Sequence, residues 1–315
     1  MTAPTKTVLV LGATGALGAA ATKAFLERGW RIKALAREPS SAERLHAGKS
    51  IDWIAGDAMK PGDVLAAAHG VDVIFHGANP RGYRNWRGLA LPMLDNSIAA
   101  AKAVGARLVF PGNVYNFGPD AWPVLTEQSP QHPRTRKGRV RVDMEQRLRA
   151  ASEDGLRVLI LRAGDFFGAG YTDSWLGKVI LKGGRAAKAI VWPGRRDAGH
   201  AWAYLPNLAE TFARLLEREA TLPAFAVFHF SGLWTASGDE FISGIRRATG
   251  RVDLPVRSFP WPFVYLAAPF VTLMREILEM RYLWNEPIRL DNSKLVAELG
   301  AEPHTPLDEA LAASI

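Results

Sequence analysis

The sequence predicts an α/β protein built on a doubly wound parallel sheet, and three observations carry this prediction. Residues 7–11 form a short apolar run that stops at a glycine-rich turn and leads into an alanine-rich helical segment. Further apolar runs alternate with helical segments as far as residue 162, at spacings suited to parallel strands joined by helices. A chain of 315 residues can also bury the core of a smaller C-terminal lobe.

The glycine-rich turn is the most informative stretch. Gly12, Gly15 and Gly18 follow the first strand at three-residue intervals and open the first helix. Such a turn lets the backbone approach an anion, and the helix N-terminus favours negative charge. This context predicts a dinucleotide whose pyrophosphate lies on the turn. The expected contacts are Gly12, Thr14, Gly15, Ala16, Leu17 and Gly18.

The second strand, residues 31–36, ends where dinucleotide folds read the adenosine ribose. No carboxylate stands there, and Arg37 follows directly. A guanidinium can hold a phosphate with two hydrogen bonds but offers nothing comparable to a bare 2′-hydroxyl. Arg37 therefore favours NADP(H) over NAD(H), unless it is a surface residue of the loop.

The turn G-x-x-G-x-x-G after an N-terminal strand, with Thr14 inside it, resembles the short-chain dehydrogenase/reductase superfamily, in particular its extended or atypical members, the NAD-dependent epimerase/dehydratases. The resemblance covers most of the chain. It implies that Asp57, which follows the strand at 51–54, binds the adenine amino group beside Ala58, although a helix cap is an open alternative. It also implies that His76 packs near the edge of the cofactor. The small residue Gly77, after the strand at 71–76, and Phe166, in the strand exit at 163–168, would lie beside the cofactor.

The sequence departs from this family at the residues that move the proton. Members carry a Ser or Thr after the fifth strand and a Tyr-x-x-x-Lys on the following helix. Here Pro111, Lys137 and Arg141 occupy those three positions. Arg141 could keep the ribose-binding role, but a guanidinium cannot act as the acid. Lys137, if desolvated beside Arg141, could donate a proton; alternatively it neutralises cofactor phosphate or faces solvent.

The later chain supplies the expected substrate side. Residues 1–168 are predicted to form the dinucleotide-binding domain and residues 169–315 mainly the substrate lobe, with 207–232 returning to the sheet. The pocket is expected to be lined from residues 79–86, 113–117, 165–171 and 192–204, whose aromatic content favours an apolar or ring-containing substrate. Tyr115 is a second catalytic candidate. The expected substrate contacts are Asn79, Asn113, Asp165, His200 and Tyr204.

Composition excludes several other classes of protein. The chain has no cysteine, which excludes disulfides and thiolate metal sites and suits a cytoplasmic protein. Its seven histidines lack partners at ligand spacing, so no metal is expected. There is no Gly-x-Ser-x-Gly elbow for a serine hydrolase. Only Lys6 precedes the first strand, so a secretory signal is not expected.

The net charge of +8 could indicate a nucleic-acid partner. The basic residues are most concentrated in residues 134–149. If this stretch is a helix, Val140, Met144 and Leu148 form a buried stripe that leaves most of the arginines on solvated faces. Without interleaved aromatic residues or a nucleic-acid motif, we expect no nucleic-acid partner.

The most apolar segment, residues 261–274, is too short to span a bilayer. We expect it to pack in the C-terminal lobe, while contact with a membrane surface or with a partner subunit, as in a homodimer, remains open. Together these features predict an NADP(H)-binding oxidoreductase or epimerase/dehydratase-like enzyme for a small carbonyl or hydroxyl substrate. The alternative is a non-catalytic redox sensor that binds NADP(H) and signals to a partner.

Overall fold

The computed structural model describes residues 5–45, 48–80 and 85–315, and the chain divides into two compact units. Unit 1 comprises residues up to 112 together with 140–161 and 209–227. Unit 2 comprises residues 113–139, 162–208 and 228–315. The chain therefore passes between the units several times, and residues 209–227 lie in unit 1 with the N-terminal segment.

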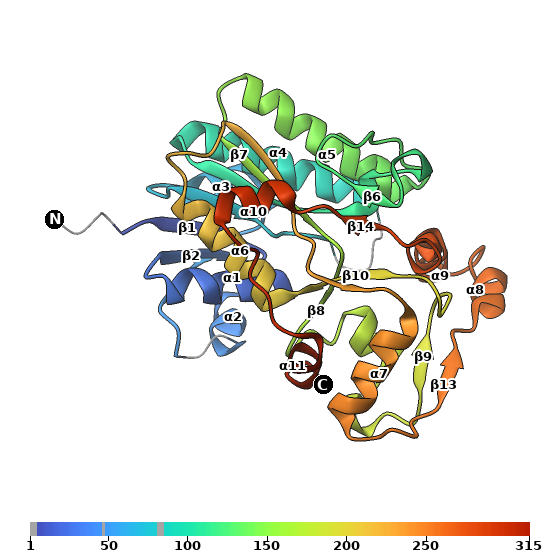
Figure 1. The fold of residues 1–315 in the computed structure, drawn as a ribbon. Helices are drawn as coiled ribbons and strands as arrows, with labels where there is room; N and C mark the ends of the chain where they lie inside the picture. Colours follow the sequence, from blue (N-terminus) through green and yellow to red (C-terminus); the bar gives the residue numbers. More distant parts are fainter. Residues whose placement is uncertain (1–4, 46–47, 81–84) are drawn as a thin grey trace. The chain divides into compact units, whose positions relative to one another are not determined.

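Unit 1 is built on a seven-stranded sheet whose spatial order is β11-β7-β5-β4-β1-β2-β3 (Figure 1). Its first strand, β1, pairs in parallel with β2 on one side and with β4 on the other. The order of the chain reverses at this point, which is where open α/β sheets bind their ligands. The strands are β1 (Thr7–Leu11), β2 (Arg31–Ala36), β3 (Ile51–Ala55), β4 (Val73–His76), β5 (Arg107–Asn113), β7 (Val158–Ala163) and β11 (Phe225–His229). The predicted doubly wound α/β fold is confirmed.

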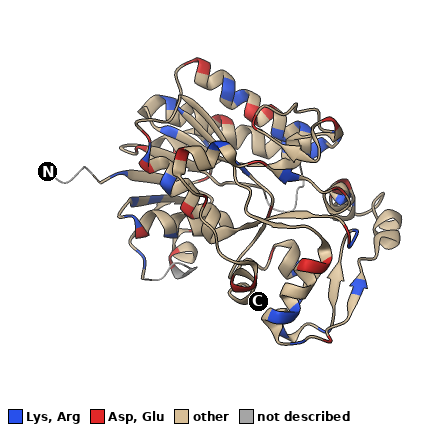
Figure 2. Cartoon of the chain, viewed as in Figure 1, with Lys and Arg blue, Asp and Glu red and all other residues tan. Residues whose placement is uncertain are grey.

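Helices flank this sheet, and α5 shows how an apolar stripe packs against its strands. In α5 (Arg136–Glu153), Val140, Met144 and Leu148 are 5%, 3% and 0% exposed, which confirms the expected stripe. Most of the basic residues of this stretch are exposed, as expected, and Figure 2 shows several blue positions along α5. The other helices are α1 (Ala16–Glu27), α2 (Pro39–Leu45), α3 (Pro61–Ala67), α4 (Trp86–Val104) and α6 (Leu205–Glu217).

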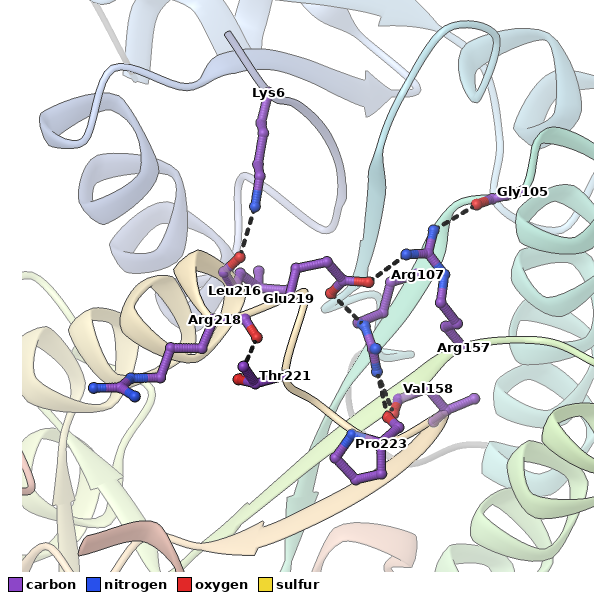
Figure 3. A network of polar contacts seen from close by, with 10 residues as sticks. All are labelled: Lys6, Gly105, Arg107, Arg157, Val158, Leu216, Arg218, Glu219, Thr221 and Pro223. Carbon is purple, nitrogen blue, oxygen red and sulfur yellow. Dashed lines mark hydrogen bonds and ion pairs between the residues drawn. The ribbon is translucent and has the colours of Figure 1, made fainter. Parts of the chain in front are cut away.

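A buried arginine ties two strands to the segment after α6 (Figure 3). The guanidinium of Arg107, 1% exposed, donates to the carboxylate of Glu219 and to the carbonyls of Val158 and Pro223. Glu219 also accepts from Arg157. Every bond in this network lies inside unit 1, so the network fixes β5 and β7 against the turn that leads to β11.

Unit 2 contains three small sheets. The largest places β10 (His200–Tyr204) between β8 (Asp165–Phe167) and β12 (Leu233–Thr235). The others pair β9 (Ile190–Trp192) with β13 (Val256–Ser258) and β6 (Val124–Leu125) with β14 (Arg289–Leu290). Its helices are α7 (Gly238–Thr249), α8 (Trp261–Ala267), α9 (Thr272–Glu279), α10 (Ser293–Leu299) and α11 (Leu307–Ala312). Short helical turns cover Val114–Asn116 (η2), Pro119–Ala121 (η3), Leu176–Ile180 (η4), Gly184–Ala186 (η5) and Arg281–Trp284 (η6).

Aromatic side chains dominate the core of unit 2. Trp202 stacks on Phe241 with ring centroids 3.9 Å apart, and Phe167 meets Trp202 edge to face. Trp284 packs against Trp192 and Trp175. These large rings hold the small sheets together in place of a continuous hydrogen-bonded sheet.

The apolar segment at 261–274 differs from the expectation. It forms α8 and the start of α9, and Phe263, Leu266 and Phe270 are 60%, 75% and 86% exposed. The expectation that this segment packs inside the lobe is therefore wrong for these side chains. No helix within the described ranges is both long enough and apolar enough to cross a membrane.

Candidate functional site

The turn between β1 and α1 has the geometry that the glycines predict. Gly12 adopts φ +87°, a backbone conformation that residues with a side chain rarely adopt. The amide of Gly15 closes the turn by donating a hydrogen bond of 2.9 Å to the carbonyl oxygen of Gly12. A Cβ on Gly12 would lie 2.6 Å from Gly77 O, and one on Gly18 would lie 2.1 Å from Gly12 O. Both positions therefore exclude any side chain.

The N-terminus of α1 is open. Its N-cap residue, Gly15, supplies no side-chain hydrogen bond, and Thr14 and Gly15 are exposed. Ala16 and Leu17 begin the helix. The first amide groups of a helix need acceptors, and the helix dipole favours an anion at this end. A pyrophosphate fits a turn whose Gly12 and Gly18 carry no side chain and whose helix begins without a side-chain cap.

The exit of β2 places Arg37 on the surface. Its side chain is exposed and makes no hydrogen bond or ion pair with any residue that the structure describes. The guanidinium is thus available to an anionic ligand, although the same exposure would suit a surface arginine.

At the exit of β3, Asp57 is not the cap of a helix. Helix α3 begins at Pro61 with Lys60 as its N-cap, so the cap interpretation of Asp57 is wrong. The Asp57 carboxylate instead accepts from the Met59 amide at 2.9 Å, and its own amide donates to Asp63. The next residue, Ala58, accepts a hydrogen bond from the Asn96 side chain through its carbonyl.

The exit of β4 holds a buried histidine with one fixed tautomer. The hydroxyl of Ser97 donates to Met93 O, so His76 Nδ1 must donate to Ser97 Oγ, 2.7 Å away. Its Nε2 is then an acceptor, and it has no hydrogen-bond partner in the described part of the chain. Burial, with the nearby charge of Arg141, lowers the pKa of His76 to about 3. This neutral ring packs against Phe110.

Arg141 is held between two aromatic rings of unit 1. Its guanidinium carbon lies 5.4 Å from the ring centroids of both Trp86 and Phe110, and Nη1 donates to Pro111 O at 3.1 Å. Pro111, which replaces the family hydroxyl, thus contributes its carbonyl. Trp86 in turn donates to Asn79 Oδ1, which orients the exposed Asn79 side chain. Of the predicted lining segment at 79–86, residues 81–84 lie outside the described residues.

Lys137, at the position of the family tyrosine, is buried rather than solvent-facing. It is 4% exposed, and Nζ donates to Glu276 O at 2.7 Å and lies 3.2 Å from Glu276 Oε2. Burial lowers the pKa of Lys137, and the carboxylate of Glu276 partly opposes that shift. The alternative in which Lys137 faces solvent is therefore wrong. Its neighbour Arg136 pairs with both Glu276 and Glu279.

Asn113 and Tyr115 share one turn. The Asn113 side chain caps η2 by accepting from the Tyr115 amide at 3.0 Å. Gly138 is required beside them, because a Cβ there would lie 2.4 Å from Tyr115 O. The start of α5 therefore packs directly on the Tyr115 backbone.

Two of the predicted substrate residues meet each other. His200 Nε2 lies 2.9 Å from Asp165 Oδ2, and His200 Nδ1 lies 3.1 Å from Leu283 O. A carbonyl can only accept, so Nδ1 donates to Leu283 O, while Nε2 faces the Asp165 carboxyl group. The imidazole also stacks on Trp284 at 4.2 Å. The remaining candidates are the buried Tyr204 and, beside Asp165 in β8, the half-buried Phe166.

The sequence did not single out Tyr282, which stacks on Trp122 and is half-buried beside this pair. Burial and then the nearby carboxylates of Asp165 and Glu279 raise the pKa of its phenol. Its hydroxyl stays protonated and has no hydrogen-bond partner among the described residues. It can therefore donate a hydrogen bond to a ligand. No local motif marks Tyr282, Glu276 or Glu279, because they meet Lys137 and Asp165 only through the fold.

Solved structures with this fold are numerous. UDP-glucose 4-epimerase from Bifidobacterium longum, in complex with NAD+ and UDP, matches with a TM-score of 0.76 at 16% identity, covering 98% of this chain and 97% of that one. UDP-glucuronic acid 4-epimerase from Bacillus cereus, in complex with NAD, gives 0.78 at 15% identity with the same coverage. WbmH from Bordetella bronchiseptica, in complex with NAD+, gives 0.75 at 18% identity, again over 98% and 97%.

Comparison with curated proteins gives no match. The sequence model of one family, in contrast, matches residues 8–228. This match covers β1 and the glycine turn at one end and most of β11 at the other, and so it takes in every strand of the seven-stranded sheet. The chain belongs to the NAD-dependent epimerase/dehydratase family.

Proposed function

We propose that this protein is an NADP(H)-dependent oxidoreductase or epimerase/dehydratase-like enzyme that acts on a small carbonyl or hydroxyl substrate. The observation that carries the proposal is the side-chain-free turn at Gly12 and Gly18, which opens an uncapped helix at the reversal point of the sheet. Family membership supports a nicotinamide cofactor and epimerase-type chemistry, and the preference for NADP(H) depends on Arg37. Bound nicotinamide would supply hydride transfer to or from carbon.

Residues of unit 1 would hold most of the cofactor. The turn from Gly12 to Gly18 would bind the pyrophosphate, and Arg37 the 2′-phosphate. Asp57 and Ala58 would lie at the adenine. Gly77, whose small size lets backbones approach, and Arg141, oriented by Trp86 and Phe110, would lie toward the second ribose. For Phe166 of unit 2 we keep the expectation that it contacts the nicotinamide.

A cofactor titration tests the Arg37 assignment. A guanidinium that grips a phosphate with charge-assisted bonds contributes about tenfold or more in affinity. We expect Arg37→Ala to weaken NADPH binding by that factor in a fluorescence titration and to leave NADH binding unchanged. Lys23→Ala, which removes another exposed cation of unit 1, is the matched control. Equal affinity of the unaltered protein for NADPH and NADH would contradict the assignment.

Lys137 and Tyr115 are the proposed proton donors. A buried lysine with a lowered pKa gives up its proton more readily than an exposed one, and Glu276 limits this tendency. Since Arg141 always keeps its proton, it is confined to binding. Asn113, Asp165, His200 and Tyr204 would contact the substrate, with Asn79 as a further candidate.

The enzyme test is a screen of aldehydes, ketones and sugar nucleotides with NADPH. General acid catalysis is worth about 100-fold or more, so Lys137→Ala should lose that much turnover. Its NADPH affinity, which depends on the turn, should remain and shows that the variant folds. Tyr115→Phe tests the second donor in the same way. Turnover of Lys137→Ala at the original rate would remove Lys137 from the mechanism.

A specific observation favours a second function, that of a redox sensor. Lys137 is bound to both the backbone and the carboxylate of Glu276, and Pro111 offers no hydroxyl, so the usual proton-transfer residues are replaced. A sensor would bind NADP(H) tightly, transfer hydride to no carbonyl class, and bind a partner differently in the two redox states. That set of results would support the sensor over the enzyme.

A further inference from the structure

The exposed apolar side chains of this protein are concentrated in one helical hairpin. We define the hairpin as residues 261–279, which hold α8, α9 and the connection through Pro269. Six of the nine large apolar side chains that are exposed in the described part of the chain belong to it. They are Phe263 (60%), Tyr265 (49%), Leu266 (75%), Phe270 (86%), Val271 (44%) and Leu273 (50%).

The hairpin is anchored at its base and uncovered elsewhere. In α9 only Glu276 is buried, where it pairs with Lys137 and Arg136. In α8 only Val264 is buried. Figure 1 shows α8 and α9 at the edge of unit 2. The fold thus anchors the hairpin through Glu276 and Val264 and leaves six of its large apolar side chains exposed.

Within the hairpin the exposed charge is positive, because its two carboxylates, Glu276 and Glu279, are mostly buried. Residues 254–275 contain no Asp or Glu, and Figure 2 shows α8 without a charged residue. Arg257 on β13 and Arg275 on α9 are exposed and form no ion pair with a described residue. Arg281 donates to the Tyr265 hydroxyl and lies over the ring of Trp261. The carboxylates of Glu276 and Glu279 are 11% and 12% exposed and already paired.

We propose that the hairpin is a docking surface for the interface of a bilayer that carries anionic lipid. Apolar and aromatic side chains beside arginines are the composition of segments that lie in the headgroup region, where buried apolar area and attraction to anionic lipid add together. The hairpin lies on the bilayer and does not cross it. The proposal is independent of the activity of the enzyme.

The charges near the hairpin favour a bilayer over a second copy of this chain as the partner that covers it. A two-fold interface through the hairpin would place Arg257, Arg275 and Arg281 of both copies around one apolar patch. Residues 254–275 of either copy contain no Asp or Glu that could neutralise them. Anionic headgroups supply the missing negative charge.

Vesicle flotation tests the proposal on the full chain. We expect binding to vesicles of phosphatidylcholine with phosphatidylserine and weaker binding to phosphatidylcholine alone. Phe270→Ser and Leu266→Ser should each lower the partition coefficient by about tenfold or more, because each removes an inserted side chain. Arg275→Gln should lower it by about fivefold on the anionic vesicles only. Val252→Ser, which changes an apolar side chain that is 78% exposed outside the hairpin, is the matched control.

Circular dichroism and NADPH titration of each variant separate loss of docking from loss of folding. The proposal is overturned if neither vesicle type is bound, or if Phe270→Ser binds as the unaltered protein does. It is also overturned if sedimentation shows a dimer that Phe270→Ser converts to a monomer while vesicles remain unbound. In that case the hairpin binds a second copy.

Discussion

At the scale of single residues, the glycine turn is where sequence and geometry agree most closely. Gly18 is required because helix α1 approaches the carbonyl of Gly12 so closely that a Cβ would lie 2.1 Å from it. The third glycine of such a turn lets the helix pack closely on the strand. A side chain at Gly18 would therefore displace the turn that is expected to bind the phosphate.

We predict that Gly18→Ala weakens NADPH binding by about 100-fold, because the turn must shift to admit the methyl group, and lowers the free energy of unfolding by about 1–3 kcal/mol. The matched control is Gly62→Ala in α3, where no atom lies within 4 Å of the added carbon. That change should leave binding intact and stabilise the helix by about 0.5–1 kcal/mol. Fluorescence titration and urea unfolding measure both effects. Undiminished NADPH affinity in Gly18→Ala would contradict the assignment of the turn.

At the scale of elements, a buried ion pair with its hydrogen bonds fixes two parallel strands against the turn that precedes a third. Arg107 and Glu219 do so in unit 1, where the buried guanidinium joins β5, the start of β7 and the turn before β11 (Figure 3). A buried charge is tolerated only while it is paired and hydrogen-bonded. Burial lowers the pKa of Arg107 and Glu219 opposes the shift, which identifies the carboxylate as the stabilising partner.

We predict that Glu219→Gln lowers the free energy of unfolding by about 3 kcal/mol, because it leaves the Arg107 charge buried without a counter-ion. Glu217→Gln is the control: that carboxylate pairs with Arg28 but is 46% exposed, and exposed pairs contribute less than about 1 kcal/mol. Urea denaturation of both variants at one pH measures the difference. Equal losses in the two variants would show that burial of Arg107 does not depend on Glu219.

At the scale of the whole molecule, the sequence predicted the elements of unit 1 far better than the contacts of unit 2. The strand at 31–36 has the predicted bounds, and the strand predicted at 51–54 ends only one residue later, at Ala55. Apolar periodicity and glycine turns are local signals, so one sequence suffices to read them. The short strands of unit 2 carry no such period.

The polar contacts of the candidate site could not be predicted for the same reason. Lys137 meets Glu276 from 139 positions away, and His200 meets Asp165 through the pairing of β10 with β8. The family motif marked Lys137, and the expected pocket marked Asp165 and His200, but neither could supply the partners of these residues. Tyr282 was missed because only the fold brings it close to the carboxylates of Asp165 and Glu279.

Each unit contains a neutral buried histidine, and both histidines affect how the stability of the chain depends on pH. His229 in unit 2 donates from Nδ1 to Leu125 O and accepts at Nε2 from Arg162, so both nitrogens are satisfied only without a further proton. Burial, with the charge of Arg162, lowers the pKa of His229 to about 3. His76 in unit 1 is lowered to about 3 as well, by burial and Arg141.

These shifts predict how stability responds to acid. Between pH 6.5 and about pH 3 these two histidines are protonated in the unfolded chain but neutral in the native protein. The unfolded state therefore binds more protons, and the free energy of unfolding falls as the pH falls. Each histidine should contribute about 2–3 kcal/mol of this loss by about pH 4.5. Urea unfolding at several pH values should therefore give a shallower acid slope for His229→Gln and His76→Gln than for the unaltered protein, even where these variants are less stable at neutral pH. His69→Gln, at an exposed histidine, is the control, and parallel slopes in all four proteins would contradict the prediction.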